Sequence, residues 1–303
     1  MKKDFLTFQD VDAGEIEALL AEAERLKALQ HSGTPHPLLQ GCSLAMIFEK
    51  ASTRTRVSFE AGMHDLGGSA LFLNAADLQL GRGEPVRDTA RVLSRYVSAV
   101  MIRAYRHETI REFAEYASIP VINGLSDLAH PCQVLADLLT LKERFSSLKG
   151  LKVAWIGDGN NVCNSLILAA GHMGFDLRVA CPPGYRPPQG VVDEAVARGA
   201  GVTFFETPEE AATGADALYT DVWVSMGSEA EREGRLRAFR GYTITSELVA
   251  LARPGAVVMH CLPAHRGEEI TDEVIEGPQS IVWDQAENRL HAQKALLVRL
   301  LKK

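Results

Sequence analysis

Short apolar segments alternate with amphipathic helical patterns along the whole 303-residue chain, and this alternation limits the fold more than any other feature. Apolar runs of strand length that are followed by helices build parallel sheets covered by helices. We therefore expect an α/β protein. The expected strands are residues 43–48, 70–73, 100–102, 121–122, 152–156, 177–180, 202–204, 217–219, 256–259 and 281–282, and the main expected helices are residues 13–29, 53–66, 86–97, 130–145, 162–173 and 287–301.

These elements form two consecutive series, and the second series begins near Leu151. The helix expected over residues 130–145 joins them, and the amphipathic C-terminal helix can pack back on the first series. The pattern predicts an α/β fold of two doubly wound parallel-sheet (Rossmann-like) domains joined by long helices. We place the first domain at residues 1–132, with the C-terminal helix 288–303 packed back on it, and the second at residues 133–287.

Charge and composition argue against several classes of protein. The formal net charge of −7 disfavours a nucleic-acid-binding protein, although a local cluster of arginines could still bind an anionic substrate. No apolar run approaches the roughly 20 residues that span a bilayer, and the N-terminus lacks the apolar segment of a signal peptide. The five cysteines are widely spread without a C-x-x-C pair, which argues against a disulfide framework or a structural zinc site. We expect a cytoplasmic protein with no membrane and no nucleic-acid partner.

The densest polar motif is Ser52-Thr53-Arg54-Thr55-Arg56, which follows a strand and opens a helix. The free N–H groups and partial positive charge of a helix start suit an anion, and either arginine can add a bidentate contact to a phosphate. An ordinary helix cap with two solvated arginines also fits the string. The glycines of a Walker loop are missing, so this would be a different kind of phosphate site.

Three positions elsewhere in the first half could complete such a site. Arg103 ends an apolar strand, where ligands of open α/β sheets collect, although a surface arginine also fits there. His130 and Gln133 share one face at the start of a long helix, so they could bond a carbonyl oxygen and an amide. A structural histidine fits the same position.

A glycine pair in the second half suggests another class of protein. Gly157-Asp158-Gly159 follows a strand and precedes a helix, as in a dinucleotide-binding turn. Val162 stands where that motif needs its third glycine, and no acidic residue follows about 20 positions later. A nicotinamide-dependent dehydrogenase therefore remains an alternative that the motif supports only in part.

The string at residues 52–56 and the string His130-Pro131-Cys132-Gln133 together resemble the aspartate/ornithine carbamoyltransferase family, and the resemblance extends over the whole chain. In that family both motifs belong to the carbamoyl phosphate site. The resemblance implies that carbamoyl phosphate binds to Ser52, Thr53, Arg54, Thr55, Gln79, Arg103, His130, Gln133, Cys261, Leu262 and Arg289. It implies catalytic roles for Arg103, His130 and Cys261.

The second half resembles the ornithine branch of that family. Residues 221–227 match its D-x-x-x-S-M-G string, and residues 260–263 match its H-C-L-P string, in which the aspartate branch has a proline at the position of Cys261. Taken singly, these residues also fit turns, loops or small core positions. The resemblance implies that ornithine binds to Asn161, Asp221, Ser225 and Met226.

The implied reaction moves the carbamoyl group of carbamoyl phosphate to the side-chain amine of L-ornithine, giving L-citrulline and phosphate. Putrescine, an acylated ornithine or aspartate stay open as acceptors, as does the direction of use in arginine metabolism. The resemblance implies no metal and no organic cofactor. Gln79 matches a family position that reaches a neighbouring subunit's site, so we expect a homotrimer or a multiple of trimers.

Overall fold

A computed structural model describes residues 3–224 and 229–302. The chain divides into two compact units, one formed by Met1–Leu139 with Glu287–Lys303 and the other by Thr140–Ala286. It passes from the first unit to the second within α5 (Pro131–Phe145) and returns within α12 (Val282–Leu301). Both crossings therefore lie inside long helices.

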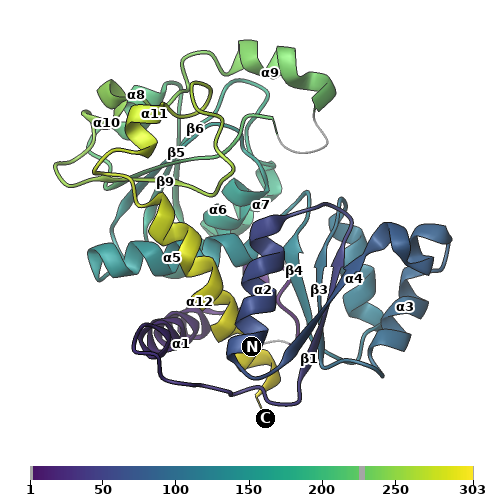
Figure 1. The fold of residues 1–303 in the computed structure, drawn as a ribbon. Helices are drawn as coiled ribbons and strands as arrows, with labels where there is room; N and C mark the ends of the chain where they lie inside the picture. Colours follow the sequence, from purple (N-terminus) through teal and green to yellow (C-terminus); the bar gives the residue numbers. More distant parts are fainter. Residues whose placement is uncertain (1–2, 225–228, 303) are drawn as a thin grey trace. The chain divides into compact units, whose positions relative to one another are not determined.

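The first unit contains a four-stranded parallel sheet in the order β2-β1-β3-β4. Its strands are β1 (Ser43–Phe48), β2 (Ser69–Asn74), β3 (Ala99–Arg103) and β4 (Val121–Leu125), and its further helices are η1 (Phe8–Asp10), α1 (Ala13–His31), α2 (Thr53–Asp65), η2 (Ala75–Asp77), η3 (Gln79–Arg82), α3 (Val86–Leu93) and α4 (His107–Tyr116). Figure 1 shows α3 and α4 on one side of this sheet and α2 on the other. All five residues of β3 are buried, as expected for a strand covered on both faces.

The second unit contains a five-stranded parallel sheet in the order β7-β6-β5-β8-β9. Its strands are β5 (Lys152–Ile156), β6 (Asp176–Ala180), β7 (Gly201–Phe205), β8 (Ala217–Thr220) and β9 (Val257–His260), and its further helices are α6 (Asn161–Met173), α7 (Gln189–Ala197), α8 (Pro208–Ala212), η4 (Glu229–Glu231), α9 (Arg232–Ala238), α10 (Ser246–Val249) and α11 (Asp272–Ile275). The expected fold of two doubly wound parallel sheets is confirmed.

Each sheet has a point where the strand order reverses. In the first unit β1 is followed by β2 on one side and by β3 on the other. In the second unit β5 is followed by β6 and β7 on one side and by β8 on the other. Ligands of doubly wound sheets bind outside the carboxyl ends of the strands at such points. The loops after β1, β3, β5 and β8 are therefore the first places to look for a site.

Two local predictions are wrong. Residues 281–282 do not form a strand: only an isolated bridge joins Val258 to Ser280, and Val282 begins α12, because a pair of apolar residues fits either element. The strand expected at residues 121–122 is too short, because β4 continues through Asn123 and Gly124 to Leu125. A Cβ at Gly124 would lie 2.3 Å from the Met101 sulfur, so this glycine allows close packing of two strands.

Within residues 3–224 and 229–302, no helix is both long and apolar enough to cross a membrane.

Candidate anion and amino-acid sites

The start of α2 presents hydroxyl and N–H donors directly after β1. Ser52 is the N-cap residue, and its Oγ accepts a hydrogen bond from the Thr55 backbone N–H at 3.3 Å. The same hydroxyl donates to Thr55 Oγ1 at 3.1 Å. The first N–H groups of a helix have no partner within the helix, and because the Thr55 N–H is bonded to Ser52, those of Thr53 and Arg54 are the ones that suit an anion.

Arg103 comes to the same end of the sheet because it is the last residue of β3 and pairs in register with Phe48, the last residue of β1. It is 5% exposed, and its Nε has no hydrogen-bond partner in the part of the chain that the structure describes. Burial, with the nearby charges of Arg289 and Arg54, lowers the pKa of Arg103 to about 10. A buried guanidinium with a donor to spare is a place for an anionic ligand.

His130, directly before α5, lies in the same group of cations. Its side chain is buried. Burial, followed by the charges of Arg289, Arg103 and Arg54, holds the pKa of His130 well below its usual value. A neutral imidazole therefore stands among three guanidinium groups, which come from α12, β3 and α2.

Arg289 is held in place by a chain of side-chain hydrogen bonds. Its Nη1 donates to Gln133 Oε1 at 2.7 Å, and its Nη2 donates to Thr55 Oγ1 at 3.4 Å. Gln133 Nε2 in turn donates to the buried carboxylate of Asp137 at 2.9 Å. Gln293, with its amide oriented to satisfy both of its groups, accepts from Arg289 Nη2 at 3.0 Å.

Asp137 and Gln293 are members of this site that the sequence reasoning missed. The signal for Asp137 was its position four residues after Gln133 on one helix face, a spacing at which an amide and a carboxylate meet. No local pattern marks Gln293, because its role depends on how α12 packs on α2.

The structure also separates the two arginines of the α2 motif. Arg54 is within electrostatic range of Arg103 and His130. The exposed Arg56 instead pairs with Glu60 at 3.0 Å, and its guanidinium carbon lies 3.9 Å from the centre of the Phe72 ring. Only Arg54 is therefore placed to bind the same anion as Arg103.

Gln79 stands apart from this cluster. It begins η3, and its side chain is exposed. Among the described residues, no hydrogen bond joins that side chain to the cluster at the start of α2. The described residues of one chain therefore do not bring Gln79 together with the other expected residues of the carbamoyl phosphate site.

In the second unit, Asp221 follows β8 at the carboxyl edge of the sheet and is 8% exposed. It accepts hydrogen bonds from Asn160 Nδ2 and from the Val222 backbone N–H, both at 2.8 Å. Asn160 also caps α6, with its Oδ1 accepting from the N–H groups of Val162 and Cys163. Asn161 is the first residue of α6. The sequence predicts a role for Asn161 but gives no sign of the contact between its neighbour Asn160 and Asp221.

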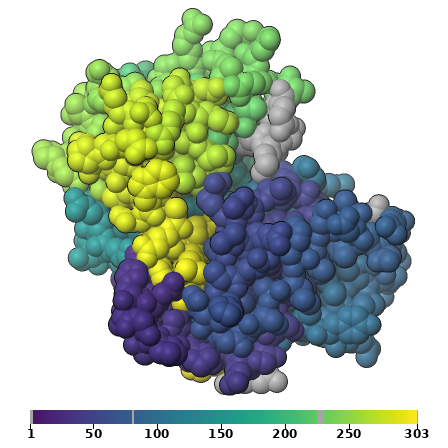
Figure 2. All heavy atoms as spheres, viewed as in Figure 1, coloured from purple at the N-terminus to yellow at the C-terminus, as the bar shows by residue number. Residues whose placement is uncertain are grey.

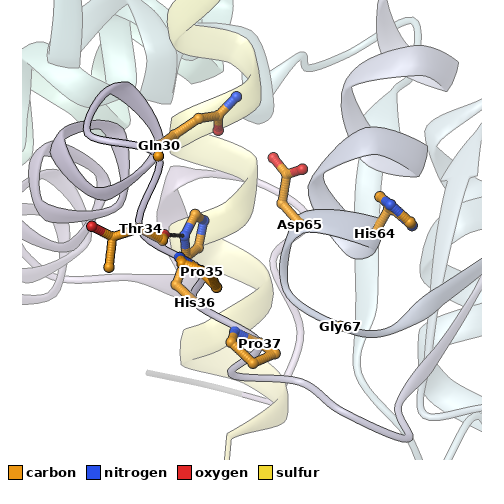
Figure 3. A pocket seen from close by; sticks show the side chains of 9 residues that line it. Gln30, Thr34, Pro35, His36, Pro37, His64, Asp65 and Gly67 are labelled. Carbon is orange, nitrogen blue, oxygen red and sulfur yellow. Dashed lines mark hydrogen bonds between the residues drawn. The ribbon is translucent and has the colours of Figure 1, made fainter.

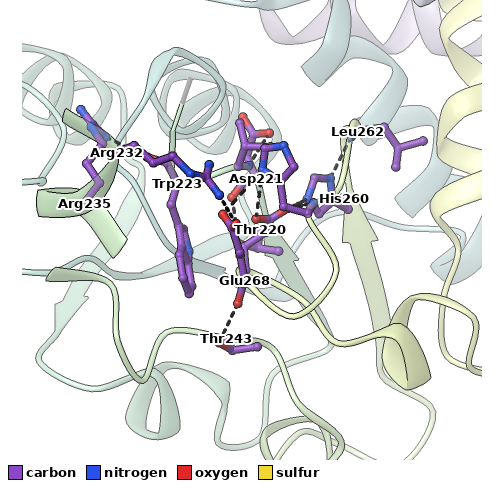
Figure 4. A network of polar contacts seen from close by, with 12 residues as sticks. Thr220, Asp221, Trp223, Arg232, Arg235, Thr243, His260, Leu262 and Glu268 are labelled. Carbon is purple, nitrogen blue, oxygen red and sulfur yellow. Dashed lines mark hydrogen bonds and ion pairs between the residues drawn. The ribbon is translucent and has the colours of Figure 1, made fainter. Parts of the chain in front are cut away.

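Leu262 and its neighbours follow β9, and buried polar contacts hold their loop (Figure 4). His260 Nε2 lies 3.0 Å from Glu269 Oε1, and His260 Nδ1 accepts from the Leu262 N–H at 2.8 Å. Leu262 has a left-handed backbone with φ 59°, a conformation that non-glycine residues adopt only when their surroundings hold it. Cys261 is half-buried next to it. Ser225 and Met226, the other expected ornithine contacts, lie outside the described residues.

The glycines of the G-x-G turn serve the protein's own packing. A Cβ at Gly159 would lie 2.3 Å from the backbone nitrogen of Pro187, and the Gly159 N–H donates to the Tyr185 carbonyl at 2.8 Å. In a dinucleotide-binding turn the second glycine lets the backbone approach a pyrophosphate. Here the loop that contains Tyr185 and Pro187 occupies the space that a pyrophosphate would need, so the dehydrogenase hypothesis is not favoured.

Asp221, His260 and Cys261 each offer a ligand atom, and these atoms lie within 4.8 Å of one another. However, both ring nitrogens of His260 already have partners in Glu269 and Leu262. Metal binding would have to break one of these buried contacts, so we assign no metal to this group.

A surface hollow of about 300 Å³ lies at the other end of α2 (Figure 3), with Gln30, His36 and Asp65 among its lining residues. These three residues contact the buried Lys294, whose Nζ donates to Gln30 at 2.8 Å and to Asp65 at 3.1 Å, and lies 2.6 Å from His36 Nε2. The hollow is roughly 20 Å along the helix from Ser52, too far to belong to the anion site.

Comparisons with known proteins agree with this division of roles. Residues 3–143 match the family model "Aspartate/ornithine carbamoyltransferase, carbamoyl-P binding domain", and residues 149–300 match "Aspartate/ornithine carbamoyltransferase, Asp/Orn binding domain". The ornithine carbamoyltransferase of Methanoculleus marisnigri is 67% identical over 99% of this chain and 97% of its own length. That of Methanocorpusculum labreanum is 61% identical over 99% of both chains.

Solved structures give the same result. The ornithine carbamoyltransferase of Pyrococcus furiosus is 54% identical, with a TM-score of 0.95 over 98% of this chain and 96% of that one. The enzyme from Thermus thermophilus is 49% identical, with a TM-score of 0.91 over 100% of both chains. With two domain models, near-complete coverage and the expected fold in agreement, the chain belongs to the aspartate/ornithine carbamoyltransferase family.

Proposed function

We propose that this protein transfers the carbamoyl group of carbamoyl phosphate to the side-chain amine of L-ornithine, giving L-citrulline and phosphate. The observation that carries the proposal is the gathering of Arg54, Arg103 and Arg289 around the start of α2, where the charges that act on Arg103 and His130 are all cationic. The relatives named ornithine carbamoyltransferase, which match nearly the whole chain, support the acceptor.

The first unit supplies the groups for carbamoyl phosphate. The phosphate binds to the hydroxyl of Ser52, the N–H groups of Thr53 and Arg54 and the guanidinium groups of Arg54 and Arg103. Charge-assisted contacts of this kind are stronger than neutral ones, and the helix start adds to them. An anion here also gives Arg103 the partner that its Nε lacks among the described residues.

The same cluster stabilises the reaction's charge. Attack by the amine places negative charge on the carbamoyl oxygen, toward which Thr55, Arg103 and His130 each direct a donor. A preformed donor at such a position is worth about 3–4 kcal/mol in other enzymes. The low pKa of His130 keeps its imidazole neutral, so it acts as a hydrogen-bond donor rather than as a charge. Gln133 holds the carbamoyl nitrogen, and Arg289 completes the pocket.

The second unit supplies the groups for ornithine. Asn161 and Asp221, with Ser225 and Met226, bind its amino-acid end, while Cys261 and Leu262 lie beside the reacting amine and the carbamoyl group. A lysine-like amine has a pKa near ~10.4 in water, and only its neutral form is nucleophilic. Partial desolvation favours that form. As the new N–C bond forms, the C–O bond to phosphate breaks, and the departing phosphate takes the amine proton.

We also propose the compartment and the oligomeric state in which the protein acts. Five free thiols suit a reducing cytoplasm. The product citrulline places the protein in arginine metabolism.

We propose a homotrimer, or a multiple of trimers, in which Gln79 completes the carbamoyl phosphate site of a neighbouring subunit.

Incubation with carbamoyl phosphate and a panel of amines tests the function. We expect carbamoylation of L-ornithine, detected as citrulline, and far slower reaction of putrescine, N-acetylornithine and L-aspartate. Comparable turnover of aspartate would contradict the acceptor, and failure to release phosphate with any amine would contradict the reaction.

A further inference from the structure

Two imidazoles and a carboxylate meet where α1 ends against α12. His31 is the last residue of α1, and Glu287 and His291 lie one helical turn apart on α12. In Figures 1 and 2 the purple α1 and the yellow C-terminal part of α12 lie side by side. All three residues belong to the first unit. The proposed function does not use them, because Arg289 is about 200° around α12 from Glu287 and so faces the other way.

The geometry of this cluster resembles a metal site. Glu287 Oε1 lies 2.7 Å from His31 Nε2 and 3.2 Å from His291 Nε2. The three ligand atoms are within 4.8 Å of one another. Zinc binds imidazole nitrogen at about 2.0–2.1 Å and carboxylate oxygen at about 2.0–2.2 Å, so modest side-chain rotations would bring all three into range. Ligands four residues apart on one helix face are common in metal sites.

The three proposed ligands differ in how far their side chains are exposed to solvent. The His291 side chain is 1% exposed, and its Nδ1 has no hydrogen-bond partner among the residues that the structure describes, so no acceptor holds the ring from the other side. The side chains of His31 and Glu287 are 59% and 39% exposed. An ion can therefore enter from solvent, the two exposed ligands can adjust, and water can complete the coordination.

We propose that His31, Glu287 and His291 form a binding site for a divalent transition metal of the zinc or cobalt type, which ties the end of α1 to α12. Two nitrogens and one oxygen suit these ions better than magnesium or calcium, which prefer oxygen alone. The site is peripheral, so the bound metal stabilises the first unit and does not act in carbamoyl transfer.

The cations near the site weaken its affinity for a metal ion. Lys27 Nζ is 4.0 Å from Glu287 Oε2 and donates to Asn288 Oδ1 at 2.8 Å, and Lys294 follows on the same helix. These charges repel a metal ion. We expect Lys27→Met to bind the metal more tightly than the unaltered protein, because that variant removes the cation next to the ligand carboxylate.

Titration of the full chain with Co²⁺, followed by visible absorption, tests the proposal. We expect one ion per chain with the absorption of a nitrogen and oxygen site and without a sulfur-to-cobalt band. His31→Ala and Glu287→Gln should each weaken binding by roughly tenfold or more. His64→Ala, which removes another exposed histidine of the first unit, should bind as the unaltered protein does.

A thiol site in the second unit would give a different result. If the only binding shows a sulfur band that Cys261→Ala removes, or if His31→Ala binds as tightly as the unaltered protein, the proposal is overturned. Absence of any binding at millimolar Co²⁺ also overturns it. Because His31 is exposed, its variant should fold even if one at the buried His291 does not, and Zn²⁺ should raise the Tm of the unaltered protein more than that of His31→Ala.

Discussion

His260 Nε2 lies 3.0 Å from Glu269 Oε1, and both side chains are fully buried. The same carboxylate oxygen accepts the backbone N–H of His265, while His260 Nδ1 accepts that of Leu262. Glu269 therefore contacts both ends of the loop that carries Cys261: the His260 side chain at the end of β9 and the His265 backbone N–H. This buried pair determines the conformation of the loop without itself being a proposed ligand of either substrate.

We expect Glu269→Ala to raise the KM for ornithine while leaving the KM for carbamoyl phosphate within a few-fold. The variant leaves the His260 ring and the His265 backbone N–H without their acceptor. Each unpaired group should lower the free energy of unfolding by about 1–3 kcal/mol. Steady-state kinetics with each substrate varied in turn, together with urea unfolding, check this. Glu269→Gln, which keeps an acceptor, should recover part of the loss. Equal KM changes for both substrates would contradict a local role.

Arg54→Ala and Arg56→Ala form a matched pair on one helix. We expect Arg54→Ala to lower kcat/KM for carbamoyl phosphate roughly 30- to 4,000-fold, because the phosphate loses a charged partner. This factor corresponds to about 2–5 kcal/mol of lost binding free energy. Arg56→Ala should stay within a few-fold, since Arg56 faces Glu60 and Phe72. Circular dichroism checks that both variants fold. Similar losses in the two variants would show that the sequence motif acts through the helix and not through Arg54.

His130 should make stability depend on pH. Its pKa in the folded protein is well below the ordinary value of 6.5, so the unfolded chain binds the proton more readily. The stabilisation is complete above pH 6.5 and is lost as the pH falls from 6.5 toward the lower folded pKa, at up to about 1.4 kcal/mol per pH unit. Burial shifts the pKa values of His107 and His291 in the same direction.

Urea unfolding at pH 7.5 and pH 5.5 measures this effect. We expect the loss of stability on acidification to be smaller in His130→Asn than in the unaltered protein, because the variant has no proton to bind there. The exposed His64 supplies the control, and His64→Asn should lose as much stability as the unaltered protein. An unchanged pH dependence in His130→Asn would contradict the prediction.

Much of this architecture is visible in the sequence because parallel strands buried on both faces appear as unbroken apolar runs. The placement of Ser52 and Arg103 at the same edge of the sheet also follows, since each is at or just beyond the carboxyl end of a neighbouring strand. Residues 281–282 show the limit of this reasoning, because two apolar residues fit a strand or a helix start equally well. Here Val282 packs into the core of the second unit as the first residue of α12.

The contacts that hold the site residues in place could not be predicted in the same way. Asn160 and Asn161 are adjacent and chemically identical, and a helix start is uncertain by one or two residues in any sequence. Only the structure shows that Asn160 is the cap and the donor to Asp221. The contact between Arg289 and Gln133 joins residues 156 positions apart, so it depends on packing that no local pattern encodes.

Cys261→Ala should raise the KM for ornithine and leave binding of carbamoyl phosphate detectable. The reason is the proposed position of the thiol beside the reacting amine, on the loop that His260 and Glu269 hold. Cys42→Ala, which alters another half-buried cysteine, should keep normal kinetics. Isothermal titration with carbamoyl phosphate and kinetics with ornithine separate the two effects. If Cys261→Ala weakens both substrates equally, the thiol is structural.

The assembly prediction concerns Gln79. Gln79 begins η3, and its exposed side chain makes no hydrogen bond with the cluster at the start of α2 in the described part of its own chain. Such a surface segment is usually a solvated connection, but family resemblance assigns it to a neighbour's site. A cyclic trimer repeats one heterologous interface three times and closes, so each Gln79 meets a site and none is left over. We therefore expect trimers, or multiples of trimers, by light scattering.

Mixing two inactive variants tests whether the site is shared. Arg54→Ala and Gln79→Ala subunits should each be nearly inactive alone, because every site then lacks one contact. Co-assembled after mild dissociation, some interfaces pair an intact Arg54 with an intact Gln79 from the neighbour, and part of the activity should return. Mixed oligomers that form without regaining activity would contradict a shared site. A fully active monomer would contradict the trimer as well, because Gln79 could then contribute only to its own chain.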